Sequence, residues 1–243
     1  MTTTYRLAVL DMAGTTVDDR HEVYRVLRES VEREGARFDD ATFQQWMGTE
    51  KRSAITHLLR LGGVEADEQL VDRAFAWFLE ELTRSYTANP PVPLPGVPEA
   101  LSALRAGGVK VGLTTGFSRD IAALILERMG WGVGADPATS VVDAVVTGDE
   151  VPEGRPAPFM IQRVMELTAV TDPAEVVSAG DTEVDVESAR RAGVLAIGVL
   201  TGKLDRADLE RAGSDVVAGS VAELTDLPGV DGGSHRVEQL RTR

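Results

Sequence analysis

Short apolar runs alternate with helix-like segments through the second half of the chain. Apolar runs of four to six residues predict buried strands, and apolar residues that recur every three or four positions predict helices. The expected strands cover 7–10, 110–116, 141–146, 176–181, 195–200 and 215–217, and the expected helices cover 97–106, 118–129, 156–167, 184–192, 206–211 and 221–224. This alternation predicts an α/β fold, a doubly wound parallel sheet with helices on both faces.

The segment between the first strand and this alternating region shows a different pattern. From Asp18 to about Ser85 only the helical period is present, interrupted at Gly48. The proline-rich stretch 89–96 cannot be a helix or a central strand, because proline removes a backbone donor and restricts the residue before it. We therefore expect an α/β core at 1–17 and 89–227, an inserted all-helical cap at 18–88, and a disordered tail at 228–243.

Composition limits the classes of partner. The chain has 25 Lys and Arg against 39 Asp and Glu, a net charge of −14, which argues against a nucleic-acid partner or an acidic membrane surface. A bound anion would need local positive charge from a metal, a few basic side chains or helix N-termini. There is no cysteine, no leader-like segment before the first strand and no run of about 18 apolar residues. We expect a cytoplasmic protein with a small-molecule ligand.

Three polar residues follow expected strands at their carboxyl ends: Asp11, Thr115 and Asp181. Parallel sheets bind ligands beyond those ends, so independent loops could meet there. Each residue also has an ordinary structural interpretation. Asp11 could cap a turn, and Asp181 with Asp185 could simply complement a helix dipole.

Four motifs, taken together, resemble those of the haloacid dehalogenase superfamily in order and rough spacing. They are Asp11-Met-Ala-Gly-Thr, Thr114-Thr115-Gly116, Gly154-Arg155-Pro156 and Gly180-Asp181-Thr182-Glu183-Val184-Asp185. Within the superfamily the chain looks most like the phosphonatase (phosphonoacetaldehyde hydrolase) branch. Three features indicate this branch: Ala13 in place of a second Asp, Arg155 in place of Lys, and Met47-Gly48-x-x-Lys51 in the cap.

The resemblance implies roles for individual residues. Asp11 would attack phosphorus and form an aspartyl-phosphate. Mg²⁺ would be held by Asp11, the backbone carbonyl of Ala13, Asp181 and Asp185, the last directly or through water. Thr115 and Arg155 would act on the transferred group, and further substrate contacts would come from Ala13, Gly116, Met47, Gly48 and His21.

Ala13 and Lys51 bear on the substrate. A methyl group at Ala13 cannot protonate a leaving alkoxide or activate water, a role worth about 10²–10⁴-fold. In the phosphonatase pattern the lysine matching Lys51 condenses with an aldehyde, and the resulting iminium accepts the electrons of the breaking C–P bond. Two alternatives stay open from the sequence: Lys51 only grips a phosphorylated substrate, or it is a solvated helix lysine.

Other positions depart from that pattern: His21 replaces Cys, Phe117 replaces Tyr, and Ala54 replaces His. We therefore carry three hypotheses. The first is Mg²⁺-dependent hydrolysis of a small phosphonate aldehyde. The second is hydrolysis of a small phosphate monoester, with Lys51 only binding and His21 assisting. The third is a phosphate-binding protein with little turnover. A homodimer could form through the cap if Val23 and Val26 are exposed.

Overall fold

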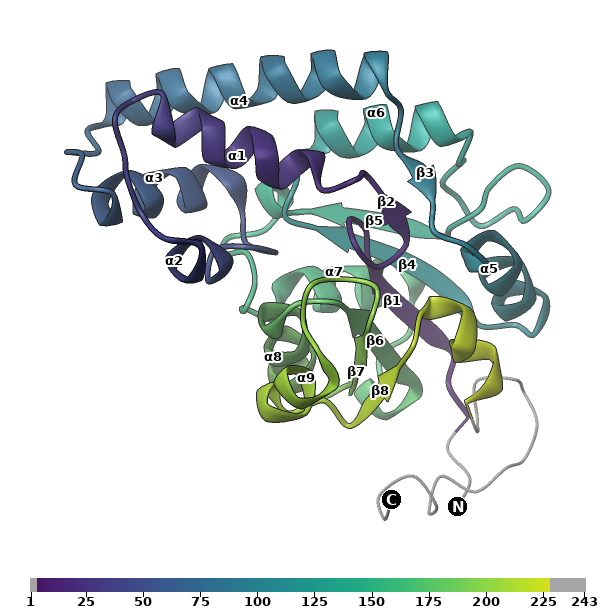
Figure 1. The fold of residues 1–243 in the computed structure, drawn as a ribbon. Coiled ribbons are helices and arrows are strands. Elements are labelled where there is room, and N and C mark those ends of the chain that lie inside the picture. The colour runs from purple at the N-terminus through teal and green to yellow at the C-terminus, as the bar shows by residue number, and fades with distance from the viewer. Residues whose placement is uncertain (1–3, 228–243) are drawn as a thin grey trace.

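A six-stranded parallel sheet forms the centre of the molecule in a computed structural model that describes residues 4–227 (Figure 1). The strand order is β5-β4-β1-β6-β7-β8. The strands are β1 (Leu7–Asp11), β4 (Lys110–Thr115), β5 (Ala144–Thr147), β6 (Val176–Gly180), β7 (Leu195–Val199) and β8 (Val216–Ala218). All pair in parallel with their neighbours. The order reverses at β1, which places a switch point beside its carboxyl end.

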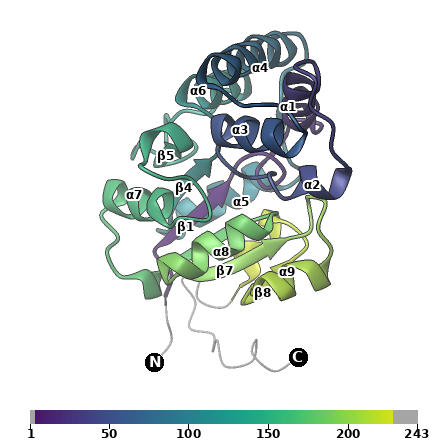
Figure 2. The ribbon, with the colours of Figure 1, turned by 90° about the vertical axis from the view of Figure 1, so that its left-hand side faces the viewer.

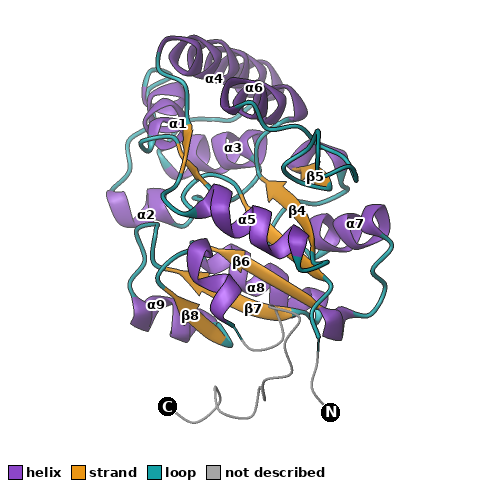
Figure 3. Cartoon of the chain, turned by 90° about the vertical axis from the view of Figure 1, so that its right-hand side faces the viewer, coloured by secondary structure: helices purple, strands orange, loops and turns teal. Residues whose placement is uncertain are grey.

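Helices cover both faces of this sheet, as Figure 3 shows from the side. Along β1, Leu7 and Val9 pack in one buried cluster, whereas Ala8 and Leu10 pack in the other. This alternation is the two-residue period of a strand that is buried on both faces. The core helices are α5 (Val97–Ala106), α6 (Arg119–Met129), α7 (Phe159–Thr168), α8 (Glu183–Ala192) and α9 (Arg206–Ala212), with 3₁₀ turns at Gly148–Glu150, Pro173–Glu175 and Val221–Asp226. The predicted doubly wound α/β fold is confirmed.

Four helices lie between the first and second strands of this sheet in the sequence. They are α1 (Glu22–Glu32), α2 (Asp40–Gln44), α3 (Lys51–Leu61) and α4 (Glu68–Ala88). In Figures 1 and 2 they group at one end of the molecule, with α4 lying along α1 and beside α6. None of the helices within residues 4–227 has the length and apolarity that crossing a membrane requires.

The two segments that connect the α/β core to the four inserted helices lie side by side. The short strands β2 (Val17–Asp18) and β3 (Val92–Pro93) pair antiparallel, so the proline-rich stretch meets the outgoing strand. Next to this pair, the buried Asp19 carboxylate accepts hydrogen bonds from Tyr86 Oη at 2.8 Å and from the Val23 amide at 2.9 Å. The division into a core and a cap at these residues stays a prediction.

Several local expectations differ from the structure. The strand expected from 141 begins at Ala144, because the Asp143 carboxylate accepts from the Val111 amide at 2.8 Å and thereby occupies the adjoining edge of β4. Ser118 occupies the N-cap position of α6, but its hydroxyl is buried without a partner. The Asp149 carboxylate instead accepts from the Arg119 amide, at 3.1 Å.

The expected exposure of Val23 and Val26, on which the proposed dimer surface depended, is wrong. Val23 and Val26 are 1% and 0% exposed, because α1 turns this face toward the other cap helices. A homodimer stays a prediction, but Val23 and Val26 cannot form its contact surface. The expected disordered tail at 228–243 lies outside the described residues.

Candidate active site

Three buried carboxylates meet at the carboxyl edge of the sheet. Asp11 ends β1, Asp181 directly follows β6, and Asp185 lies in the first turn of α8. One oxygen from each lies within 4.8 Å of the others. β1, which ends in Asp11, and β6, which Asp181 directly follows, are hydrogen-bonded neighbours, which explains why residues 170 positions apart come together. Oxygen ligands at this spacing fit a hard divalent cation such as Mg²⁺.

Arg155 is the buried cation of this cluster. Its Nη1 donates to Asp11 Oδ1 at 2.6 Å and lies 2.9 Å from Asp185 Oδ1, and its Nη2 donates to Thr114 Oγ1 at 2.7 Å. The donors of a guanidinium lie in a rigid plane, whereas those of an ammonium rotate, so Arg155 holds its three partners in fixed directions. Arg155 therefore fixes the orientation of the Asp11 carboxylate.

The cluster holds more negative than positive charge. Burial raises the pKa of Asp11 to about 6 against the opposing pull of Arg155, and burial together with the Asp11 charge raises the pKa of Asp181 well above its usual range. One arginine does not neutralise three buried carboxylates, so the site favours an additional cation. Thr15 Oγ1 also donates to Asp181 Oδ1, at 2.9 Å.

Close backbone packing explains two glycines around the acids. Gly14, in the turn after β1, has a φ of +91°, and a Cβ there would lie 2.7 Å from Asp181 Oδ2. Gly202, in the loop after β7, is packed so closely that a Cβ would collide with the same carboxylate. Thr201 Oγ1 ties this second loop to the Gly14 carbonyl at 2.5 Å. Ala13 lies in the same turn, where it forms a bridge with Val17.

Thr115 ends β4 and Gly116 follows it, at the edge of the sheet where the sequence predicts a phosphate-binding turn. The Thr115 hydroxyl accepts from the Phe117 amide at 3.2 Å and stabilises its own turn. A Cβ at Gly116 would lie 2.5 Å from the Thr49 carbonyl oxygen of the cap. Because Gly116 has no side chain, the cap loop can pack against the core at this position. A contact between Gly116 and a substrate stays a prediction.

The cap loop is closed over the core. A Cβ at Gly48 would lie 2.6 Å from Thr182 Oγ1, and Glu50 packs against Gly148 and Gly154. Glu50 is also the N-cap of α3: its carboxylate accepts from the amides of Arg52 and Ser53 at 2.8 and 2.7 Å. This cap fixes where α3 begins, and the first helical residue is Lys51.

The Lys51 side chain is buried beneath this closed loop. Its Nζ donates to the Thr49 carbonyl oxygen at 2.6 Å and lies 5.7 Å from the centre of the Phe117 ring. Burial lowers the pKa of Lys51 to about 8, and the positive charge of Arg155 adds to this effect while Glu50 and Asp11 oppose it. Lys51 is therefore not a solvated surface lysine, which removes one of the three alternatives left open by the sequence.

His21 is not brought into the acidic cluster. It precedes α1 in a left-handed conformation with a φ of +61°, and it lines a hollow with Tyr24, Met47 and Lys203. A role for His21 in proton transfer stays a prediction, and among residues 4–227 no contact between its ring and the three carboxylates supports it.

Two residues near the acids were missed by sequence reasoning. Thr114 was quoted only as part of a motif, yet its hydroxyl accepts a hydrogen bond from Arg155. Tyr24, on α1, lies close enough to the cluster that burial and the charges of Asp181 and Asp11 raise the pKa of its phenol well above the usual range. In the sequence, nothing distinguishes Tyr24 from an ordinary core residue on the buried face of a helix.

Comparisons with known proteins show what this chain is similar to. Residues 5–193 match the family model described as a haloacid dehalogenase-like hydrolase. A phosphonoacetaldehyde hydrolase from Bacteroides fragilis is 31% identical over 215 residues, which span 82% of this chain and 77% of the relative. One from Bacillus cytotoxicus is 32% identical over 227 residues, with 86% and 82% covered. A solved phosphonoacetaldehyde hydrolase-like protein from Oleispira antarctica superposes with a TM-score of 0.76 at 27% identity, over 98% of this chain and 94% of that one.

Proposed function

Because the chain belongs to the haloacid dehalogenase-like hydrolases, and its relatives include proteins named phosphonoacetaldehyde hydrolase, we propose that it hydrolyses the C–P bond of phosphonoacetaldehyde or a closely similar aldehyde. The observation that carries this proposal is the buried amine of Lys51 in the closed cap. A nucleophilic lysine must lose its proton near neutral pH, and the burial of Lys51 lowers its pKa to about 8.

Lys51 prepares the substrate for cleavage. Its neutral amine adds to the aldehyde carbon, and uptake of one proton with loss of water leaves a protonated iminium. The Asp11 carboxylate then attacks phosphorus, and the electrons of the C–P bond move to the iminium nitrogen to give an enamine. Hydrolysis of the enamine frees acetaldehyde and Lys51, and water cleaves the aspartyl-phosphate to phosphate. Because the leaving carbon is stabilised by the iminium, no acid is needed at Ala13.

The core residues hold the transferred group and the charges around it. Asp11, Asp181 and Asp185 would hold Mg²⁺, with the Ala13 carbonyl as a further ligand. The bound ion would neutralise developing charge on the phosphoryl oxygens. Arg155 keeps Asp11 oriented, and the closed loop from Met47 to Glu50 excludes water from the reacting groups.

A product assay tests the proposal. With phosphonoacetaldehyde and Mg²⁺, the wild type should release acetaldehyde and phosphate in equal amounts. Lys51→Arg, which keeps the charge but cannot form the iminium at neutral pH, should lose the activity by about 10³-fold or more. Lys110→Gln is the matched control, because Lys110 lies at the opposite end of β4. An unaffected Lys51→Arg variant would exclude the proposal.

A small phosphate monoester is the second candidate substrate. It is favoured by the apolar residues Phe117 and Ala54, which stand where the phosphonatase pattern has Tyr and His. In that case Lys51→Arg retains most turnover, and phosphate is released from a monoester without any aldehyde. Retention of phosphate without turnover of either class would favour the third hypothesis, a phosphate-binding protein.

A further inference from the structure

Tyr24 carries a nearly buried phenol that lacks a partner in the protein. It lies in the first turn of α1 and is 9% exposed. Its ring packs edge-on against Phe43, with 6.5 Å between the ring centres, which restricts the direction of the side chain. Within residues 4–227 the hydroxyl makes no hydrogen bond, yet its oxygen is not sealed from solvent. Buried phenols normally have a partner, so this donor is available to a ligand.

The phenol lines a hollow whose buried part is otherwise apolar. This hollow of about 460 Å³ is lined by residues of α1, α2 and the loop after β7. Its buried lining residues are Tyr24, Phe43 and Met47, whereas the others are at least partly exposed to water. An apolar wall with one placed donor suits a short carbon chain that carries one oxygen acceptor.

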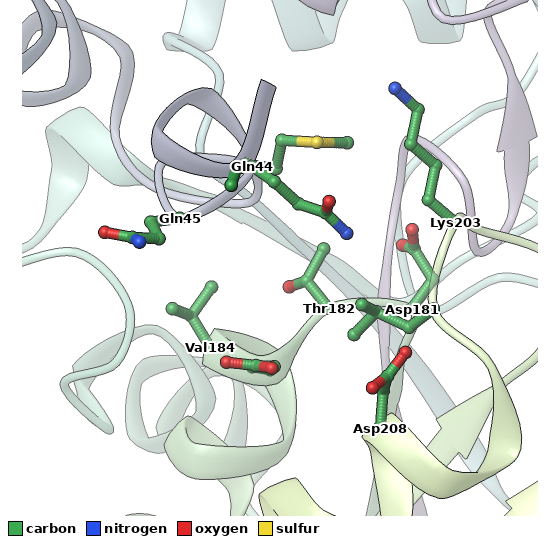
Figure 4. Close-up of a pocket in the computed structure, with 11 residues that line it drawn as sticks. Gln44, Gln45, Asp181, Thr182, Val184, Lys203 and Asp208 are labelled. Atoms are coloured by element: carbon green, nitrogen blue, oxygen red, sulfur yellow. The ribbon is translucent and has the colours of Figure 1, made fainter. Parts of the chain in front are cut away.

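The hollow adjoins the acidic cluster. Three of its lining residues, Gln44, Met47 and Lys203, also line a second cavity of about 350 Å³, and Asp181 lines the core side of that cavity. Figure 4 shows Gln44 and Lys203 approaching the space beside Asp181 from the cap and from the loop after β7. Tyr24 therefore stands on a space that connects with the surroundings of the acids.

The acids keep the phenol in its protonated form. Burial raises the pKa of Tyr24 well above its usual range, and the charges of Asp181 and Asp11 add to this effect. For Lys51, burial lowers the pKa to about 8, while the charges of Glu50 and Asp11 oppose the change. The phenol and the amine thus come from different cap helices and share Asp11 as a neighbour. Near neutral pH the phenol is a hydrogen-bond donor, and the amine can become a nucleophile.

Other cap donors beside the acids already have partners. Lys51 Nζ donates to the Thr49 carbonyl oxygen at 2.6 Å, and Tyr86 Oη donates to the Asp19 carboxylate at 2.8 Å. Tyr24 differs from both, because its proton is uncommitted within residues 4–227. Its hydroxyl therefore adds nothing to the fold that the structure describes, and a role toward a ligand accounts for its place.

We propose that the Tyr24 hydroxyl binds the carbonyl oxygen of the substrate and holds the carbonyl carbon for attack by Lys51. This inference rests on the proposed function, which places phosphorus at Asp11 and an aldehyde at the lysine. The hydrogen bond draws electrons toward the oxygen, which makes the carbon a better electrophile. The phenol keeps its own proton, so the proton taken up as water leaves comes from solvent. Tyr24 then selects compounds with an oxygen acceptor on the second carbon from phosphorus.

Two unreactive ligands of the same branched shape test this contact. Phosphonoacetamide has the carbonyl oxygen but forms no iminium, and isobutylphosphonate lacks the oxygen. Titration calorimetry with Mg²⁺ gives the ratio of their affinities. In Tyr24→Phe the ratio should fall about fivefold, the size of one neutral hydrogen bond, with the affinity for isobutylphosphonate unchanged. Tyr86→Phe is the matched control and should keep the ratio, because the partner of that phenol is Asp19.

Thermal unfolding separates this role from a structural one. Tyr24→Phe removes no hydrogen bond within the described protein and should melt no lower than the wild type, whereas Tyr86→Phe loses its bond to Asp19 and should melt lower. Equal destabilisation of the two variants would contradict the proposal, because it would show that the Tyr24 hydroxyl serves the fold.

Two calorimetric results would also overturn the contact. One is the same affinity ratio in the wild type and in Tyr24→Phe. The other is an equal loss of affinity for both ligands, which would place the hydroxyl at the phosphoryl group instead of the carbonyl. Failure of the proposed function has a different signature, namely no release of acetaldehyde from phosphonoacetaldehyde by the wild type, and it leaves the calorimetric comparison intact.

Discussion

The two sides of the candidate site are built in different ways. On the core side, Asp11, Asp185 and Thr114 are all held by the Arg155 guanidinium, at 2.6–2.9 Å, and every one of these groups is buried. On the cap side, Lys51 has one polar partner among residues 4–227, a backbone carbonyl two residues earlier in the chain. The core side is fixed by several side-chain contacts, whereas the lysine is held by burial and a single bond.

This difference separates two tasks. The core groups must keep one geometry while charge develops on phosphorus, and preorganised hydrogen bonds serve that purpose. The lysine must exchange its proton and accept a covalent partner, so fewer contacts and a lowered pKa suit it. We therefore expect substitutions in the core to affect catalysis or stability through charge. Substitutions in the cap should act through loop closure and through the protonation of Lys51.

The largest expected effect is at the nucleophile. Asp11→Asn should reduce turnover by about 10⁴-fold or more, because an amide cannot form the phosphorylated intermediate. Its stability should not fall much, since the change removes one of three mutually repelling buried carboxylates. Steady-state kinetics and chemical denaturation measure the two effects. An active Asp11→Asn enzyme would exclude this residue as the nucleophile.

Removal of the buried guanidinium should mainly affect folding. Arg155→Ala leaves three buried carboxylates without their cation and should lower the free energy of unfolding by about 3–5 kcal/mol. Urea denaturation without a divalent cation measures this loss. Arg206→Ala is the control, because its ion pair with Glu210 is exposed and should contribute less than about 1 kcal/mol. Similar losses in both variants would contradict the central role of Arg155.

The protonation of Lys51 should be visible in stability against pH. Its pKa is about 8 in the folded protein and near the ordinary 10.5 when unfolded, so the unfolded chain binds more protons between these values. The free energy of unfolding should therefore rise from pH 8 to 10.5, by up to about 3 kcal/mol. Lys51→Met should lack that rise. Parallel pH profiles for the two proteins would indicate that the folded lysine keeps its ordinary pKa.

Mg²⁺ should stabilise the folded protein through the carboxylates. At 100 times its dissociation constant, the ion should add about 2.7 kcal/mol. Thermal unfolding with Mg²⁺ and with EDTA measures this gain in the wild type. The gain should be largely lost in Asp181→Asn, which keeps the shape of the side chain but not its charge. A gain of the same size in the variant would place the ion elsewhere.

The smallest expected effect concerns cap closure. Gly116→Ala would place a methyl group 2.5 Å from the Thr49 oxygen and should hold the loop away from the core, with a loss in kcat/KM of about tenfold. Gly107→Ala is the matched control, since its nearest neighbours would lie at 3.4 Å and its φ is an ordinary −77°. Unchanged kinetics in Gly116→Ala would mean that the closed contact is unnecessary for turnover.

Much of the fold could be predicted from the sequence because local patterns determine it. The alternating core segments gave α5 from Val97 to Ala106 with its observed bounds, and placed Asp11 and Asp181 at strand ends on the same edge. Contacts between distant segments could not be predicted. The bond from Arg155 to Thr114, the neighbourhood of Tyr24 and the burial of Val23 all depend on how helices pack, which periodicity alone leaves undetermined.

The most direct test of the account is reductive trapping of the lysine. Wild-type protein should be mixed with phosphonoacetaldehyde and borohydride, digested, and analysed by mass spectrometry. We expect a reduced two-carbon adduct on Lys51 and no adduct on Lys110 or Lys203. Full turnover of phosphonoacetaldehyde with Lys51 left unmodified would contradict the proposed chemistry.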